Sequence, residues 1–284
     1  WWCVMQGIHR FLSKIHVSDT TAKRIFKILT GGVYVFLYAP VLIVVILSFT
    51  EQRVPAFPMK DFSLKWYWAL VPPEYDEQLV AALFDSIQIA VISAIGSGIV
   101  GTLAALGIVR GNFQRRLLSG EVLNTAFLSP IVVPWVVTGL AVLTLFSILG
   151  IQGTFVSVII GHILITLPFV VLVVSSQLSG FDREVEEAAK NLGATEIRTF
   201  YEVTLPLILP GVVAGMLFAF TISFDNFTQT FFWVGGNIET LPIVIYGKIQ
   251  TGIDPTINAI GTIIVLMSVT LAAVAEVLSS RLMN

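Results

Sequence analysis

Residues 86–109 read SIQIAVISAIGSGIVGTLAALGIV, which is 24 consecutive residues without a charged side chain. A helix needs roughly 20 predominantly apolar residues to cross the hydrocarbon core of a bilayer. A second uncharged run, residues 122–181, is 60 residues long and must hold two such helices, with Gly150-Ile151-Gln152-Gly153 as the turn between them. Helices on the surface of soluble proteins carry a charged or polar face, which these runs lack. The sequence therefore predicts an all-α integral membrane protein.

The composition of the whole chain supports the same class. Of its 284 residues, 56% are hydrophobic and 12% are charged, whereas soluble domains average about 25% charged residues. The single cysteine, Cys3, excludes an intrachain disulfide, and His9, His16 and His162 are too scattered to form a metal site. No G-x-x-x-x-G-K-[ST] nucleotide-binding motif occurs. We therefore expect a chain that holds no metal or cofactor and is not itself an enzyme.

Six membrane-spanning helices are expected from the apolar runs. Their predicted bounds are 29–49, 86–109, 123–147, 154–178, 206–225 and 257–278. Pro130 and Pro134 fall in the third of these spans and Pro168 in the fourth. Because proline removes a helical hydrogen bond and its ring clashes with the preceding turn, we expect kinks there, either as gate hinges or as static packing features.

Lysine and arginine predict the orientation, because cytoplasmic loops of membrane proteins carry an excess of basic residues. Twelve of the 16 basic residues belong to segments on one side: the tail 1–28, the loops 110–122 and 179–205, and Arg281. We therefore expect both termini to be cytoplasmic. Residues 1–28 would form a cytoplasmic tail and residues 29–280 a single six-span domain, whose outward loops are 50–85 and 226–256.

The loop at residues 180–206 has the pattern of two short helices. Asp182 can cap the first helix, Gly193 suits its C-terminal end, and Thr195 can begin the second. Acidic residues complement the helix dipole in the first turns: Glu184, Glu186 and Glu187. A small apolar face has the spacing i, i+3, i+4 and i+7: Val185, Ala188, Ala189 and Leu192. Such a face can dock into a cleft of another protein or pack on the chain's own membrane domain, and the spacing alone leaves both readings open.

Three features of this loop closely resemble the EAA loop of binding-protein-dependent ABC importers: Glu187-Ala188-Ala189, Gly193 six positions after Glu187, and Val203-Thr204-Leu205-Pro206. The resemblance runs from about residue 25 to residue 280 and is strongest with the C-type permease of spermidine/putrescine importers. Further shared stretches are Leu167–Val170, Gly180–Asp182, Leu192–Ala194, Leu241-Pro242, Ile245-Tyr246 and Asn258-Ala259. The resemblance implies the type I ABC importer permease fold in the bacterial inner (cytoplasmic) membrane, with residues 180–206 as the coupling loop.

The resemblance also implies roles for the loop residues. Glu187 would be the charged anchor toward a cytoplasmic ATPase, Gly193 the elbow, and Pro206 the residue that closes the loop. The docking face would consist of Ala188, Ala189 and Leu192.

The implied partners are a dimer of ABC ATPases that bind the ATP and Mg, a second permease subunit and a periplasmic solute-binding protein. The second permease can be an identical copy or a paralogue, and the family favours a paralogue. ATP binding would bring the coupling loops together and open the spans outward, and hydrolysis would reset them inward, which is alternating access. The chain itself would hold no cofactor and bind no nucleic acid.

The solute pathway is less sharply defined by the sequence. Ionisable residues inside a membrane are costly and usually functional. Asp225 lies at the outer end of the fifth span, where it can also be an interfacial carboxylate in contact with water. Aromatic residues after it can offer cation–π faces or form an interfacial belt: Phe227, Trp233 and Tyr246. Polyamine permeases show a pair of acidic residues where this chain has Asp225-Asn226, so an amide here replaces one carboxylate.

Import of a polyamine, spermidine or putrescine, is therefore the first expectation, with Asp225, Asn226, Phe227, Trp233 and Tyr246 as candidate pathway residues. The same machinery importing an amino acid, an opine or an aminophosphonate is the alternative that the amide fits. An ion-coupled secondary transporter would need paired charges or broken helices in mid-membrane, and these spans lack charge at that depth. His162 is expected to be a packed, hydrogen-bonded helix residue rather than a proton relay.

Overall fold

The computed structural model describes residues 19–53, 59, 61–73, 75–111, 120–236, 238–252 and 255–282. Every regular element in these ranges is a helix, apart from an isolated antiparallel bridge between Thr50 and Phe62. In chain order the elements are α2 (Asp19–Leu47), α3 (Lys65–Trp68), α4 (Glu77–Arg110), α5 (Gly120–Val132), α6 (Trp135–Ile148), α7 (Phe155–Gly180), α8 (Glu184–Asn191), α9 (Glu196–Thr199), the π-helical turn η2 (Phe200–Thr204), α10 (Leu205–Phe224), α11 (Thr230–Trp233), α12 (Leu241–Thr251) and α13 (Pro255–Leu282). The prediction of an all-α protein is confirmed for these residues.

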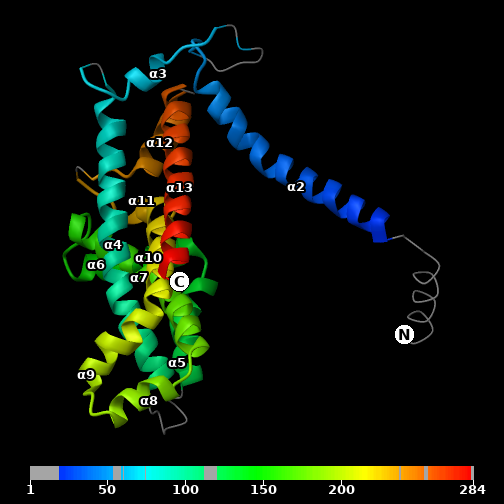
Figure 1. The fold of residues 1–284 in the computed structure, drawn as a ribbon. Coiled ribbons are helices and arrows are strands. Elements are labelled where there is room, and N and C mark those ends of the chain that lie inside the picture. Colours follow the sequence, from blue (N-terminus) through cyan, green and yellow to red (C-terminus); the bar gives the residue numbers. More distant parts are fainter. Residues whose placement is uncertain are drawn as a thin grey trace, which may run out of the picture.

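The core of the molecule is the bundle of α4, α7 and α10, which run side by side (Figure 1). Small residues allow this close approach. A Cβ added at Gly101 of α4 would lie 2.7 Å from Val170 Cγ1 of α7, and one at Gly215 of α10 would lie 3.3 Å from Val170 Cα. Lipid supplies no hydrophobic force between helices, so membrane bundles depend on such close packing. Val170 is fully buried and lies against Gly101 of α4 and Gly215 of α10.

Among the described residues, four helices are long and apolar enough to cross a membrane: α2 over Lys23–Leu47, α4, α7, and the continuous run α9–η2–α10 over Glu196–Phe224. α5 and α6 together add a fifth candidate, and α13 is apolar over Pro255–Thr270. α4 begins nine residues before the predicted start at residue 86, because Asp76 caps it: Asp76 Oδ1 accepts a hydrogen bond from Leu79 N at 3.0 Å.

The third predicted span, residues 123–147, is not one straight helix. Thr125–Val132 and Trp135–Ile148 meet at an angle of 109°. Pro134 lies at the break with extended backbone angles, φ −53° and ψ 133°, because proline removes a helical hydrogen bond and clashes with the turn before it. Pro130 and Pro168, where kinks were also expected, lie inside helices that continue past them.

The two ends of the bundle carry different elements. α3 lies at one end, and α8 and α9 lie at the opposite end (Figure 1). α2 contacts α13 but extends away from the bundle for most of its length, and the apolar window of this helix has no buried residue. Of the predicted N-terminal tail, residues 1–28, the structure describes residues 19–28, and these belong to α2.

Candidate functional site

The loop before α10 folds into the two helices that its sequence predicts. Asp182 Oδ1 accepts a hydrogen bond from Glu184 N at 3.0 Å at the start of α8. Gly193 ends this helix with φ +92°, a left-handed conformation that glycine adopts without a steric cost. Thr195 caps α9, its Oγ1 accepting from Arg198 N at 3.3 Å.

α9 continues through a π turn into α10 and forms one helical run that ends at Phe224. The π turn closes with Leu205 N donating to Phe200 O. Pro206 follows in the first turn of α10. A proline ring clashes with the carbonyl four residues before it, and the wider π turn accommodates that carbonyl. Pro206 therefore marks the start of α10, as predicted, without a break in the helix.

Most of the apolar side chains of α8 and of its C-cap residue Leu192 face outward. Leu192 is 90% exposed and Val185 47% exposed, Ala188 is exposed, and Ala189 is half-buried. Glu187 is exposed as well, and its carboxylate lies 3.5 Å from Arg183 Nε in a solvent-exposed pair. Exposed pairs of this kind contribute about 0–1 kcal/mol, so Glu187 remains free to bind a partner.

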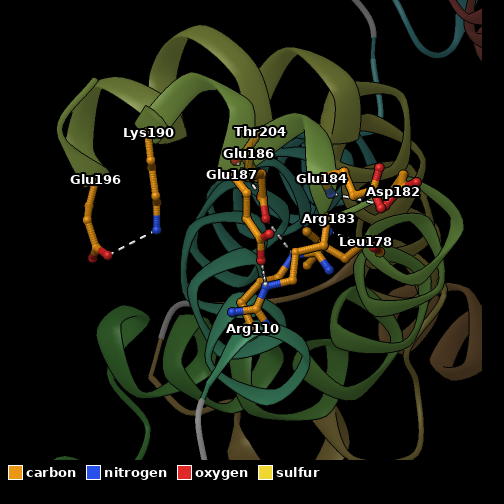
Figure 2. A network of polar contacts seen from close by, with 10 residues as sticks. All are labelled: Arg110, Leu178, Asp182, Arg183, Glu184, Glu186, Glu187, Lys190, Glu196 and Thr204. Atoms are coloured by element: carbon orange, nitrogen blue, oxygen red, sulfur yellow. Dashed lines mark hydrogen bonds and ion pairs between the residues drawn. The ribbon is translucent and has the colours of Figure 1, made fainter. Parts of the chain in front are cut away.

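Glu186 is the one buried residue of α8, with 9% exposure. Its Oε2 lies 3.0 Å from Arg110 Nε at the end of α4, and its Oε1 accepts a hydrogen bond from Thr204 Oγ1 at 2.7 Å. Figure 2 shows the carboxylate pointing from α8 toward Arg110. The Nε–H of Arg110 finds no hydrogen-bond partner among the described residues, so its contact with Glu186 is an ion pair without hydrogen-bond geometry.

Arg110 makes two further contacts with the end of α7. Its Nη2 donates to Leu178 O at 3.1 Å, and its guanidinium carbon lies 4.6 Å from the centre of the Phe181 ring. We call Arg110, Glu186, Thr204, Leu178 and Phe181 the Arg110 cluster. The sequence predicts Glu186 in the first turns of a helix and Arg110 on the basic side of the membrane, but it does not predict their pairing. One signal was available: neighbouring residues on a helix are 100° apart, so Glu186 and Glu187 cannot share one face.

Three of the five predicted pathway residues lie together at the other end of α10. Asp225, Phe227 and Tyr246 line a cavity of about 460 Å³ between α10, α12 and α13. The rings of Phe227 and Tyr246 are 4.8 Å apart, and Asp225 is exposed. We call this space the outer cavity, after the orientation that the basic residues predict. A carboxylate beside two aromatic rings is an arrangement that attracts an organic cation.

Asn226 lies outside the outer cavity and is 1% exposed. Its Oδ1 accepts from Gln229 N at 3.1 Å and from Thr230 N at 3.2 Å, and its Nδ2 donates to Gln229 Oε1 at 2.8 Å. Gln229 Nε2 in turn donates to Thr138 Oγ1 at 2.6 Å. Asn226 therefore holds the start of α11 and connects it to α6.

Trp233 is also fully buried, and its Nε1 donates to Gly139 O at 2.9 Å. His162 lies beside it, with Nδ1 2.7 Å from Ser223 Oγ and Nε2 3.0 Å from Thr230 Oγ1. The prediction of a packed, hydrogen-bonded histidine is confirmed.

Comparison with known proteins identifies the family. The family model of the binding-protein-dependent transport system inner membrane component matches residues 97–284. The spermidine/putrescine transport system permease protein PotC of Escherichia coli (strain K12) is 34% identical, over 89% of this chain and 94% of the relative. The putrescine transport system permease protein PotI of the same strain is 35% identical over 85% of each chain. The sulfate transport system permease protein CysT of Salmonella typhimurium (strain LT2) is 30% identical, over 80% of this chain and 85% of the relative.

Two solved structures share the fold. A chain of a bacterial ABC transporter involved in the import of the acidic polysaccharide alginate superposes with a TM-score of 0.66 at 17% identity, covering 93% of this chain and 98% of that one. A chain of the MetNI methionine ABC transporter gives 0.59 at 15% identity, covering 72% and 96%. A broken helix such as α5–α6 would by itself also suit a secondary transporter, but the sequence match decides between the two classes. The chain therefore belongs to the binding-protein-dependent transport system inner membrane components and is a permease subunit of an ABC importer.

Proposed function

We propose that this permease subunit imports a small organic cation, with a polyamine as the first candidate. The observation that carries the proposal is the outer cavity, where Asp225 lies with the rings of Phe227 and Tyr246. A carboxylate attracts an ammonium group by charge, and an aromatic face adds a cation–π contribution. The names of PotC and PotI, which associate those relatives with spermidine and putrescine, support the same choice.

Asn226 limits what the outer cavity offers to a cation. Because its amide is buried and holds α11, the cavity receives one carboxylate from the Asp225-Asn226 pair. Asn226 and Trp233 would then act on the pathway by positioning α11 rather than by touching the solute. The same observation favours the second candidate, a solute with a single cationic group such as an amino acid or an opine; an aminophosphonate belongs to the same alternative. The name of CysT, a relative at 30% identity, refers to sulfate, so relatives at this level of identity differ in the solute that their names give.

The energy would come from a dimer of ABC ATPases that bind ATP and Mg and dock on α8. The outward apolar face of α8 supports this reading, because Leu192 and Val185 find no cover within the described chain. Glu187 would be the charged anchor, Ala188 and Ala189 would complete the docking face with Leu192, Gly193 would be the elbow, and Pro206 would begin the helix that responds. ATP binding and hydrolysis would alternate the spans between outward and inward openings.

The proposed topology has six spans: α2, α4, the bent pair α5–α6, α7, α9–η2–α10, and α13. Both termini would then be cytoplasmic, and α3 would face a periplasmic solute-binding protein. The second permease subunit, a paralogue by analogy with the family, would cover α2, whose apolar window has no buried residue within this chain.

Uptake into proteoliposomes tests the solute. The complete importer, with the cognate binding protein, is supplied with labelled putrescine or spermidine at limiting concentration. We expect Asp225→Asn to lower the uptake rate about tenfold, equivalent to about 1.4 kcal/mol, because one charge contact is lost. Asp61→Asn is the control, since Asp61 is an exposed carboxylate outside the cavity. Failure of the binding protein to bind any polyamine would exclude the first candidate, whatever the variants do.

A further inference from the structure

α8 contacts the span bundle through a buried charged residue instead of an apolar one. Val185 and Ala188 of α8 face outward, and the buried residue of the helix is Glu186. The other side-chain tie from α8 to a neighbouring helix, Lys190 to Glu196 on α9 at 3.0 Å, is exposed and lies away from the bundle (Figure 2). Glu186 is therefore the buried link between α8 and the spans in the part of the chain that the structure describes.

The Arg110 cluster joins this link to every helix of the core. Arg110 is the last residue of α4, and it holds the end of α7 through Leu178 O and Phe181. Thr204 directly precedes α10 and donates to the second carboxylate oxygen of Glu186. α4, α7 and α10 are the three helices that pack against one another around Val170. A displacement of α8 is thus applied to all three at one point.

The chemistry of the cluster makes the connection stiff. The side chains of Arg110 and Glu186 are 19% and 12% exposed, so each has given up most of its hydration. Breaking a buried pair leaves each charge without its counter-charge in a site with little water, which is strongly unfavourable. An apolar contact, in contrast, can slide over its neighbour at little cost because it has no directional requirement. α8 therefore moves with the spans rather than past them.

We propose that Glu186 and Arg110 are positioning residues for energy coupling, which carry the movement of α8 to α4, α7 and α10. This inference rests on the proposed docking of the ATPase on α8. It assigns the transmitting function to the inward acid, Glu186, and leaves the docking function with the outward residues Glu187 and Leu192.

The test is the ratio of solute transported to ATP hydrolysed in the reconstituted importer. Glu186→Gln keeps the size of the side chain and the acceptor for Thr204 Oγ1 but removes the charge. We expect normal copurification of the ATPase and continued ATP hydrolysis, with the ratio lowered about tenfold, a typical size for coupling between sites. Glu196→Gln is the matched control, because it removes an ion pair of the same 3.0 Å length at an exposed position of the same loop.

A double-mutant cycle checks that the two residues act together. If they form one link, Arg110→Gln combined with Glu186→Gln lowers the ratio no further than either change alone. Arg110→Lys, which keeps the charge, is expected to retain more of the ratio than Arg110→Gln, and it provides a second readout if a neutral variant fails to fold.

Three results would overturn the proposal: an unchanged ratio in Glu186→Gln, additive effects in the cycle, or loss of bound ATPase in proportion to lost transport. The last result would make Glu186 a support for the docking face only. Failure of the docking proposal is seen separately, since Leu192→Asp would then retain the ATPase in full.

Discussion

Gly161 of α7 faces the ring of Trp233 so closely that replacement by alanine should destabilise the subunit. An added Cβ would lie 2.6 Å from Trp233 Cε3 and Cζ3 and 3.1 Å from Cδ2. Carbon atoms in contact prefer a separation of about 3.5–4.0 Å, so the ring would have to withdraw by about 1 Å. It is held in place by its hydrogen bond to Gly139 O and by edge contacts with Phe146 and His162.

The expected magnitude follows from two opposing effects. Overpacking of a core costs about 1–3 kcal/mol, while alanine in place of glycine gains about 0.8–1 kcal/mol inside a helix. Gly107→Ala on α4 shows the second effect alone, because an added Cβ at Gly107 meets nothing within 4 Å. The difference between the two variants therefore isolates the cost of overpacking. The two variants should therefore differ by about 2 kcal/mol in the free energy of unfolding, or about 4–8 °C in Tm at about 2–4 °C per kcal/mol.

Thermal unfolding of the purified subunit in detergent, followed by tryptophan fluorescence, measures this difference. Gly161→Ala should melt below the parent protein, and Gly107→Ala should melt at or above it. Equal melting temperatures for the two variants would refute the reasoning, since the ring of Trp233 would then be free to move.

Three further substitutions probe the loop and the outer region. Glu187→Lys should leave Tm nearly unchanged, because its pair with Arg183 is exposed, but should reduce ATPase copurification; intact transport would contradict the docking role. Gly193→Val should lower the free energy of unfolding by about 1–2 kcal/mol, because φ at this position is +92°, and it should impair transport. Gly193→Asn should impair transport less, since asparagine tolerates positive φ. Equal transport by the two variants would exclude backbone strain as the cause. Asn226→Asp should lower the free energy of unfolding by about 1–3 kcal/mol, because it removes the donor to Gln229 Oε1 and buries a carboxylate. The matched change Asp225→Asn at the exposed neighbour should shift Tm little. A larger loss of Tm in Asp225→Asn than in Asn226→Asp would contradict the buried, hydrogen-bonded position of Asn226.

Local chemistry made much of the loop predictable. Gly193 ends α8 and Thr195 caps α9 because a positive φ and a first-turn acceptor are properties of single residues, readable without knowledge of the fold. The helical class was equally accessible, because uncharged runs of the length of residues 86–109 have few alternatives.

The remaining features depend on contacts between residues far apart in the chain. The inward turn of Glu186 requires Arg110 and Thr204, and the local pair of Asn226 with Gln229 is held in place by the distant Thr138. Asp225 and Asn226 are neighbours in sequence, yet one lines the outer cavity and the other is buried.

The sequence predicts a kink at Pro134 but not the size of its angle. Proline requires an interruption of the helix, while the angle of 109° also depends on tertiary contacts of α6, which packs against α11. The predicted start of α4 at residue 86 follows the uncharged run alone, whereas the helix begins at Glu77, directly after the capping residue Asp76.

The separation of Arg110 and Glu186 in the chain determines when their ion pair can form during synthesis. Glu186 lies 76 residues after Arg110 in the chain, so at about 5–20 residues per second the ribosome needs roughly 4–15 s between the two. In the proposed orientation, the new guanidinium spends that interval at the cytoplasmic boundary, where a basic residue retains the end of its span. Arg110 can form its ion pair with Glu186 only after α8 has emerged from the ribosome. A neutral residue at position 110 would therefore weaken both the insertion of α4 and, later, the closure of the finished bundle, and the first loss would be visible on truncated nascent chains that end before residue 186.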